Sequence, residues 1–263
     1  MIFVRAIVFL IVSSLITIWY TSQGMVGAVF GVKPMTRHRW VTRWAPAMMW
    51  ASRALLGIRC RVEGRENIPA GPAVIVSKHQ SAWETFGLQA IFPPLCFVLK
   101  RELLWVPFLG WGLASIPKIA IDRAAGKNAL AQVVEQGRER LEKGLWVAIF
   151  PEGTRVAPGV RGRYRPGAAF LAKRAGVSVV PVAHNAGDFW RRNAFLKYPG
   201  EVVVSIGPPI ETKGVRVEEI HRRTRDWIEN EMTRLFPHHF QGGNVEQGED
   251  EKGSVSENGK IVR

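Results

Sequence analysis

Cysteine is nearly absent from this 263-residue sequence, which contains only Cys60 and Cys96. Two cysteines without metal-ligand spacing exclude a disulfide framework and a cysteine-based metal centre, and they suit a reducing compartment. No internal repeat is found, which excludes a solenoid. Acidic residues are also scarce, 22 against 36 lysines and arginines, so the formal net charge is +14. The partner surface is therefore expected to be anionic: phospholipid, nucleic acid or a phosphorylated substrate.

Charged residues are missing altogether from positions 6–32. A helix of this length, at about 1.5 Å per residue, would exceed the roughly 30 Å hydrocarbon core of a bilayer. The stretch is therefore predicted to span the membrane with tilt, or to break near Gly24 and re-enter one leaflet. A cleaved signal peptide, with Arg5 ahead of an apolar core at 7–20, is the alternative, but no small-x-small cleavage site follows at the right distance.

The next segment, RHRWVTRWAPAMMWASRALLG at 37–57, separates apolar residues and arginines into different sectors of a helix. At about 100° per residue one sector collects the following residues: Trp40, Trp44, Met48, Ala51 and Leu55. This pattern predicts an interfacial helix whose cations meet lipid phosphates. A helix packed on the domain core is the alternative, and Pro46 could kink or restart it. The excess of arginine after the apolar stretch predicts that the following domain lies in the cytoplasm.

Beyond position 57, short apolar runs alternate with helical patterns. The predicted strands are 58–62, 73–77, 95–99, 116–121, 145–150, 177–182 and 201–206, and the predicted helices are 83–91, 127–143, 166–175 and 217–236. This alternation predicts an α/β fold with a largely parallel central sheet of about seven strands flanked by helices. We therefore expect a membrane-associated helical segment at 1–57, an α/β domain at 58–239 and a disordered acidic tail at 240–263.

Polar residues follow four of the predicted strands. His79 follows the second, the pair KR at 100–101 the third, and the pair DR at 122–123 the fourth, while the fifth runs directly into PEGTR at 151–155. Loops after strand ends are where such folds gather ligand groups. One histidine, several carboxylates and several cations are therefore expected to converge at one edge of the sheet, as a site for a phosphate-bearing substrate with a proton to move.

His79 and Glu84, in the stretch SKHQSAWETF, allow two interpretations. If His79 precedes the helix and Glu84 lies in its first turn, the carboxylate can orient the imidazole for catalysis. Alternatively, Ser81 and Glu84 form a capping box, in which each side chain satisfies the other residue's backbone N–H. The two interpretations can coexist. On one continuous helix, residues five apart would diverge by roughly 140° and could not pair.

The other candidates also have ordinary interpretations. FPEGTR could be a turn stabilised by a Glu152–Arg155 ion pair, and the basic residues at 100–101 and 122–123 could be surface charges. The aromatic residues that follow His79 are expected in the core or against the membrane, with an acyl slot as the alternative for some of them: Trp83, Phe86, Trp105, Phe108 and Trp111.

Taken together, these motifs resemble the glycerophospholipid acyltransferases, in particular the bacterial 1-acyl-glycerol-3-phosphate (lysophosphatidate) acyltransferases. The resemblance covers roughly residues 60–210. It lies in HQSAWE at 79–84, KIAIDR at 118–123, FPEGTR at 150–155 and VVPVA at 179–183, in the family's order, with KRELLWVPFLG at 100–110 between the first two. Two departures are Lys78, where the family usually has Asn, and Glu84, where it usually has Asp.

The resemblance implies transfer of a fatty acyl group from acyl-CoA or acyl-ACP to the sn-2 hydroxyl of lysophosphatidate, giving phosphatidate. A histidine with a pKa near 6.5, roughly the unperturbed value, suits deprotonation of a hydroxyl, and a carboxylate can fix its tautomer. His79 is therefore expected to be the general base and Glu84 its orienting partner. No acyl-enzyme is expected, because the sequence has no G-x-S-x-G nucleophile motif.

The resemblance assigns FPEGTR to the acceptor. Arg155 would bind its phosphate, Gly153 would allow close backbone approach, Glu152 would hold the loop or the glycerol, and Thr154 belongs to the same binding loop. Further phosphate ligands are expected at two positions: Arg123 and Lys100. Arginine suits a phosphate because its planar fork can bond two oxygens. No metal or cofactor is expected beyond the acyl thioester.

The expected partners are lysophosphatidate, the acyl thioester, the phospholipid membrane and, as an option, acyl carrier protein. The expected location is the cytoplasmic face of the inner membrane. A nucleic-acid partner is not expected, because the aromatics follow apolar segments and do not interleave with basic residues. Three alternatives remain: a family member acting on another lysophospholipid or an ornithine or glycan lipid, a thioesterase or lipase, and a non-enzymatic membrane-anchored binder.

Overall fold

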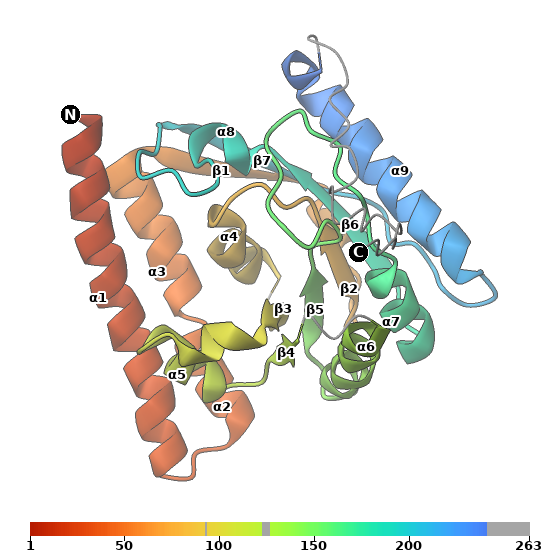
Figure 1. The fold of residues 1–263 in the computed structure, drawn as a ribbon, viewed down its shortest axis with the longest axis horizontal. Coiled ribbons are helices and arrows are strands. Elements are labelled where there is room, and N and C mark those ends of the chain that lie inside the picture. The colour runs from red at the N-terminus through yellow and green to blue at the C-terminus, as the bar shows by residue number, and fades with distance from the viewer. Residues whose placement is uncertain (93, 123–126, 241–263) are drawn as a thin grey trace, which may run out of the picture.

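The computed structural model describes residues 1–92, 94–122 and 127–240, and its centre is a seven-stranded sheet (Figure 1). The strands are β1 (Ile58–Glu63), β2 (Val74–Ser77), β3 (Leu95–Lys100), β4 (Ile119–Ile121), β5 (Trp146–Ile149), β6 (Val179–His184) and β7 (Gly200–Ile206), in the order β1-β7-β6-β2-β5-β3-β4. All neighbouring pairs are parallel except β6 and β7. The predicted α/β class with a largely parallel sheet is confirmed.

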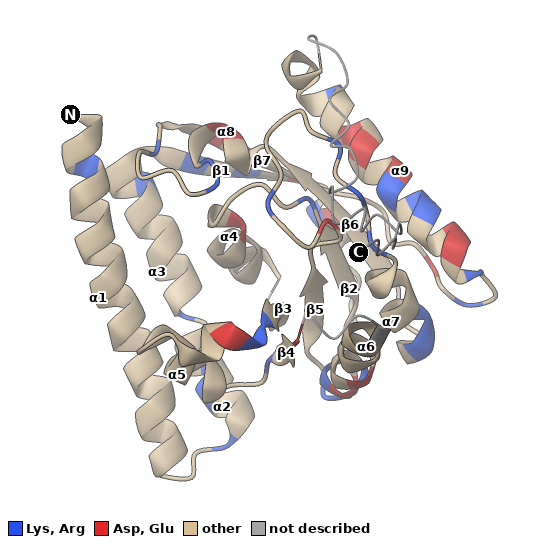
Figure 2. Ribbon diagram, in the orientation of Figure 1, with Lys and Arg blue, Asp and Glu red and all other residues tan. Residues whose placement is uncertain are grey.

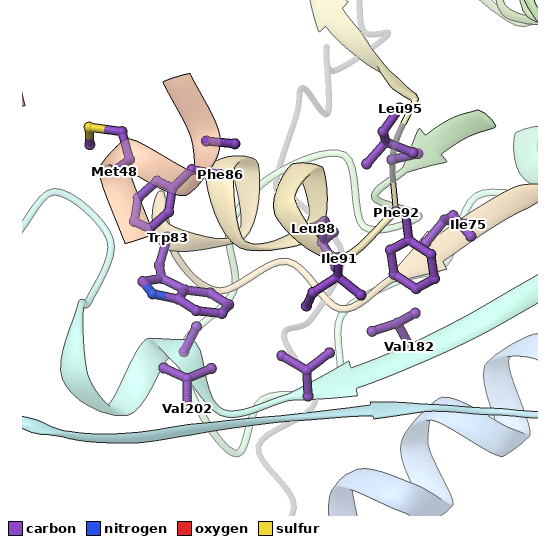
Figure 3. Packing of buried hydrophobic residues seen from close by; sticks show 14 of the residues in the cluster. Met48, Ile75, Trp83, Phe86, Leu88, Ile91, Phe92, Leu95, Val182 and Val202 are labelled. Atoms are coloured by element: carbon purple, nitrogen blue, oxygen red, sulfur yellow. The ribbon is translucent and has the colours of Figure 1, made fainter. Parts of the chain in front are cut away.

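Helices cover both faces of this sheet, which is why its central strands read as continuous apolar runs. On one face Ile75 packs with residues of α3 (Trp44–Ala51) and α4 (Trp83–Ile91). On the other face Val74 and Val76 pack with residues of α6 (Lys127–Glu142), α7 (Gly167–Ala175) and α9 (Val217–Leu235). Figure 3 shows the first face, where the labelled side chains of α4 lie between Met48 and the strand residues Val182 and Val202.

The N-terminal apolar stretch forms one helix, α1 (Ile2–Val29). The expected alternative of a break near Gly24 is wrong, because the helix continues through this position. Glycine is required there for a different reason: a Cβ atom at Gly24 would collide with the side chains of Ser115 and Val41. The residue lets α1 approach two neighbours, α2 (Pro34–Val41) and α5 (Leu109–Ala114), closely.

The predicted interfacial helix at 37–57 is also wrong as a single helix. The chain ends α2 at Val41, restarts as α3 with Pro46 in its first turn, and closes with a π-helical turn, η1 (Ser52–Leu56). Met48 is buried in the core, and the indole Nε1 of Trp44 donates to Thr17 Oγ1 at 3.0 Å. The apolar sector of α3 therefore faces the protein, as the alternative interpretation expected.

The surface of α1 remains largely apolar and exposed. Figure 2 shows a single basic band near its N-terminal end, which is Arg5, and no other charged residue along the helix. Trp19 is 66% exposed and Leu15 is 62% exposed. The helix is long and apolar enough to cross a membrane, so it is compatible with membrane association.

Two short helices escaped the sequence analysis: α5 and α8 (Ala186–Phe189). The predicted strand at 116–121 is shorter than expected, because α5 and the turn after it occupy the chain up to Ser115 and only Ile119–Ile121 pairs with β3. Within residues 1–92, 94–122 and 127–240 the chain also forms three 3₁₀ turns: η2 (Arg65–Asn67), η3 (Arg101–Trp105) and η5 (Pro237–His239). Apart from Phe240, the predicted disordered tail lies outside the described residues.

Candidate active site

His79 lies in the loop between the end of β2 and the start of α4, and Glu84 lies in the first turn of α4. This places the two residues on different elements, so the divergence expected on one continuous helix does not arise. His79 Nδ1 is 2.6 Å from Glu84 Oε2, and the Glu84 side chain is 0% exposed while that of His79 is 15% exposed. The imidazole therefore bridges a buried carboxylate and the surface of the site.

Glu84 also accepts hydrogen bonds from the backbone of the turn that precedes α4. Its Oε1 accepts hydrogen bonds from the backbone N–H of Gln80, at 2.6 Å, and of Ser81, while Ser81 Oγ accepts from the N–H of Trp83 at 3.1 Å. One carboxylate oxygen thus serves the helix start and the other serves His79. Burial raises the pKa of Glu84 to about 7, opposed by the nearby His184 and Arg155 and by these backbone donors.

His184, at the end of β6, is a site residue that the sequence analysis missed. Its Nδ1 accepts the backbone N–H of Ala186 at 3.2 Å, so Nε2 carries the proton and donates to the carbonyl of Lys78 at 2.8 Å. The same Nε2 lies 3.6 Å from Glu84 Oε1. Burial lowers the pKa of His184. A polar residue directly after a buried run was the available signal, the same one that marked His79.

The FPEGTR segment docks onto His79 from β5. The ring of Phe150 stacks on the His79 ring, with centroids 4.0 Å apart, and the N–H of Val156 donates to the carbonyl of His79 at 2.8 Å. Gly153 has a φ of +70°, a conformation that residues with a side chain rarely adopt. The segment therefore turns sharply between two contacts that fix it against the histidine.

Glu152 does not form the ion pair with Arg155 that the alternative interpretation of FPEGTR allowed, and its carboxylate lies instead against Lys78. It is 1% exposed and lies 3.4 Å from Nζ of Lys78, itself 2% exposed. Lys78 Nζ donates to Glu229 of α9 at 2.7 Å, and the hydroxyl of Tyr164 donates to the same carboxylate at 2.8 Å. Lys78, which departs from the family pattern, thus links the FPEGTR segment to α9 through its contacts with Glu152 and Glu229.

This buried cluster predicts a pH-dependent stability. Burial raises the pKa of Glu152 from 4.5 to about 7, and the charge of Lys78 opposes the shift only in part. The folded state binds the proton of Glu152 more tightly than the unfolded state does. The contribution of this proton to the free energy of unfolding is therefore complete below pH 4.5 and is lost as the pH rises through about 7. Glu152→Gln should remove this pH dependence. Its free energy of unfolding should rise relative to that of the wild type by roughly 1–3 kcal/mol between about pH 5 and pH 8.

Urea unfolding of both proteins in detergent, repeated across this pH range, measures the difference. The matched control is Glu135→Gln, whose parent side chain is 77% exposed on α6 and should change stability little at any pH. Unfolding free energies of wild type and Glu152→Gln that stay parallel across the range would contradict the assignment.

Two cavities meet at Arg155. The first, of about 350 Å³, is mostly apolar and runs from His79, Phe150 and Arg155 toward Thr17 and Thr21 of α1. The second, of about 980 Å³, lies between the 155–158 segment and α8. Its lining includes the cations of three residues: Arg155, Arg191 and Arg192. The Nε of Arg155 is buried and has no hydrogen-bond partner among the described residues, so this donor is available to an anion.

The remaining predicted residues lie at varied distances from this junction. Lys100 lines the first cavity with His79, and it also forms an ion pair of 3.2 Å with Glu102. Thr154 is exposed and lines neither cavity. Arg123 lies outside the described residues, while Asp122 at the end of β4 is 3.8 Å from Arg101.

The described part of the chain holds one group with metal-ligand spacing, formed by Asp188, His238 and His239. Its ligand atoms lie within 4.8 Å of one another, on the wall of the second cavity. His239 Nε2 is 2.7 Å from Asp188 Oδ1, so a direct contact already accounts for their proximity. His79 and Glu84 belong to no such group among the described residues.

A buried carboxylate, a histidine at the carboxyl edge of a parallel sheet and a cationic segment beside them agree with a known family. The chain belongs to the acyltransferase family, whose model matches residues 59–185. The resemblance found in the sequence is confirmed.

Within the family the chain is similar to the 1-acyl-sn-glycerol-3-phosphate acyltransferase of Pseudomonas aeruginosa. The two are 44% identical over 239 residues, which cover 89% of this chain and 92% of that protein. The mouse 1-acyl-sn-glycerol-3-phosphate acyltransferase alpha is 31% identical over 69% of this chain and 65% of its own length. The crystal structure of PlsC, the 1-acyl-sn-glycerophosphate acyltransferase of Thermotoga maritima, shares the fold with a TM-score of 0.74 and 21% identity, covering 88% of this chain and 95% of that one.

Proposed function

We propose that the protein transfers a fatty acyl group from acyl-CoA or acyl-ACP to the sn-2 hydroxyl of lysophosphatidate, forming phosphatidate for phospholipid synthesis. The observation that carries this proposal is the 2.6 Å contact between His79 and Glu84, placed where Arg155 and an apolar cavity meet. The Pseudomonas relative, a 1-acyl-sn-glycerol-3-phosphate acyltransferase that is 44% identical over most of both chains, supports the same acceptor.

In the proposed reaction His79 Nε2 takes the proton of the acceptor hydroxyl as its oxygen attacks the thioester carbonyl. Glu84 accepts the Nδ1–H and stabilises the imidazolium that forms. The tetrahedral intermediate then breaks its carbon–sulfur bond, and the departing thiolate receives the proton from His79. The products are the ester and the free thiol, and the histidine returns to its neutral form.

No enzyme nucleophile takes part in this scheme. Cys96 lines the first cavity, but burial raises the pKa of its thiol to about 12, so almost none is present as thiolate near neutrality. The pKa of Cys60 is raised to about 11 for the same reason. Acyl transfer is therefore proposed to be direct, within a complex that holds both substrates.

The two cavities suit the two ends of the substrates. Acyl chains fit the first cavity, which Phe97, Leu99 and Leu113 line with apolar groups. The unpartnered Nε of Arg155 is proposed to bind the acceptor phosphate, with Lys100 as a second cation. Arg191 and Arg192 are proposed to meet the phosphates of the donor in the second cavity.

Membrane association is proposed to hold this site at the headgroup plane. The exposed apolar surface of α1 would anchor the chain, so that the acceptor is reached by diffusion within the bilayer. The arginines at 37, 39 and 43, directly after α1, favour the cytoplasmic side of the inner membrane for the α/β domain.

Arg155→Gln is expected to raise the KM for lysophosphatidate about 10- to 100-fold, because a charge-assisted contact is worth roughly 1.5–3 kcal/mol. The measurement is initial thiol release from oleoyl-CoA at varied acceptor concentration. Arg163→Gln, an exposed arginine of the same loop, is the matched control and should leave the KM unchanged. An unchanged KM in Arg155→Gln would contradict phosphate binding by this residue.

Comparing acceptors tests the proposed function itself. Purified wild type should form phosphatidate from lysophosphatidate, and should act far more slowly on lysophosphatidylethanolamine, whose phosphate is a diester, and on an ornithine lipid. Preferential turnover of either alternative acceptor would replace lysophosphatidate as the substrate. Binding of these lipids without any thiol release would favour the non-enzymatic alternative.

A further inference from the structure

A second group of exposed apolar side chains lies on η3 and α5, far in sequence from α1. We call residues 103–111 the aromatic knob. Its exposed members are Trp105 at 81%, Trp111 at 47%, Phe108 at 43%, and Leu103 and Val106 at 41% each. Soluble surfaces rarely gather so many large apolar residues in so short a stretch, so this exposure calls for a partner.

The backbone of the knob holds these rings outward at a conformational cost. Phe108 has a φ of +59°, which a bulky residue adopts only under strain. At Gly110 a Cβ atom would collide with the carbonyls of Leu103 and Leu104, so the chain doubles back tightly here. The rings of Phe108 and Trp111 contact each other at 5.4 Å between centroids. The exposure is therefore built into the turn and does not come from a loose loop.

The knob adjoins the exposed apolar surface of α1. Gly112 of α5 packs against Thr21 of α1, with no room for a Cβ atom between them, and α5 lies beside the lower half of α1 in Figure 1. At its base Lys100 and Arg101 are exposed, with side chains 49% and 66% accessible. Glu102, 56% exposed and paired with Lys100, lies beside them, and the charged band in Figure 2 ends within η3, so that α5 carries no charge. Apolar rings above cations are the arrangement expected of a protein surface that enters a bilayer below its phosphates.

The inner side of the same segment lines the first cavity, which contains His79. Leu109 lies on its wall together with Leu113 of α5, Leu103 is shared between the cavity wall and the exposed surface, and His79 lines the same cavity. One short segment therefore has a face toward the outside, beside α1, and a face toward the site.

We propose that the aromatic knob inserts into the lipid bilayer and forms the mouth through which the acceptor's acyl chain passes from the membrane into the cavity. The part that concerns the acceptor rests on the proposed function; the insertion does not. The occupant is lipid and not a protein, because the knob continues the apolar surface of α1 and its own residues are uncharged, with Lys100 and Arg101 at its base.

Insertion is tested with Trp105→Cys, labelled with the fluorophore NBD in the full-length protein and reconstituted into phosphatidylcholine–phosphatidylglycerol vesicles. Lipids with a nitroxide on the acyl chain should quench this label and shift its emission to the blue. The matched control is Phe170→Cys on α7, 39% exposed on the other face of the sheet, which should show neither effect. Unmodified protein, treated with the same reagent, corrects for label on Cys60 and Cys96. Equal quenching at 105 and 170, or none at 105, would overturn the insertion.

The mouth is tested with Trp105→Gln and two acceptors: 1-oleoyl lysophosphatidate in vesicles and a hexanoyl analogue dissolved as monomers. The ratio of the vesicle rate to the monomer rate should fall about tenfold, which corresponds to roughly 1.4 kcal/mol. Phe170→Gln should leave the ratio unchanged. An equal loss with both acceptors would overturn the mouth. If wild type acylates neither acceptor, the proposed function fails, while the quenching result still decides whether the knob enters lipid.

Discussion

Replacing His79 with alanine is expected to lower kcat for acyl transfer by about 10³-fold or more, with little change in melting temperature. The hydroxyl of a glycerol is a poor nucleophile near neutrality, and no other described base shares the position of His79 between Glu84 and the cavity. His184 cannot replace it, since its Nε2 proton is committed to the Lys78 carbonyl and its ring is fully buried.

The measurement is thiol release from oleoyl-CoA under saturating lysophosphatidate, with thermal unfolding followed on the same preparations. His221→Ala, on α9 away from the cavities, is the control and should retain wild-type turnover. Near-normal turnover in His79→Ala would exclude His79 as the general base.

Glu84→Gln is the second substitution with a large expected effect, a loss of about 10²- to 10⁴-fold in kcat. The amide keeps an oxygen for the N–H groups of Gln80 and Ser81, so the start of α4 is preserved. Its NH₂ group, however, would donate to His79 Nδ1 and force the proton onto Nε2, where the acceptor hydroxyl must be bound. The wrong tautomer cannot act as a base, and the imidazolium loses its counter-charge.

Rates and melting temperatures of Glu84→Gln together separate the two roles of this residue. A large loss of rate at an unchanged melting temperature is the expected result, and an unchanged rate would leave Glu84 with the capping role alone. The pH dependence gives a further check. Because burial raises the pKa of Glu84 to about 7, wild-type turnover should fall as the pH drops below this value and the carboxylate becomes protonated.

The edge of the sheet that holds the site was predictable because parallel strands place their carboxyl ends together. The polar residues after β2, β3 and β5 could therefore be assigned to one region before their distances were known. His79 and Glu84 were close in sequence, so local geometry alone decided whether they could meet.

Contacts between distant segments were not predictable. Lys78 and Glu229 are 151 positions apart, and nothing in the pattern of α9 marks Glu229 as the partner of a buried lysine. For the same reason the alternative interpretation of FPEGTR paired Glu152 with Arg155, three residues away in the same turn, and could not point to Lys78 on another loop. A buried ion cluster depends on which elements pack together, and periodicity does not specify that.

The prediction of an interfacial helix at 37–57 was wrong for a different reason. An apolar sector on a helix looks the same whether it faces lipid or protein, and Trp44 and Met48 turned out to face the protein. The aromatic knob gives the opposite case. Trp105 and Phe108 belong to no amphipathic pattern that would mark an exposed apolar surface, yet both side chains are exposed. The packing of the elements, and not the sequence pattern, therefore decides which apolar side chains are exposed.

Acyl transfer is proposed to be direct and to depend on deprotonation of the acceptor by His79. The most direct measurement is rapid mixing of a stoichiometric amount of wild-type protein with oleoyl-CoA, following free thiol with and without lysophosphatidate. No burst of thiol is expected without the acceptor, and thiol and phosphatidate should form in equal amounts when it is present. A burst of one thiol per protein in the absence of the acceptor, with the oleoyl group retained on the chain, would exclude direct transfer.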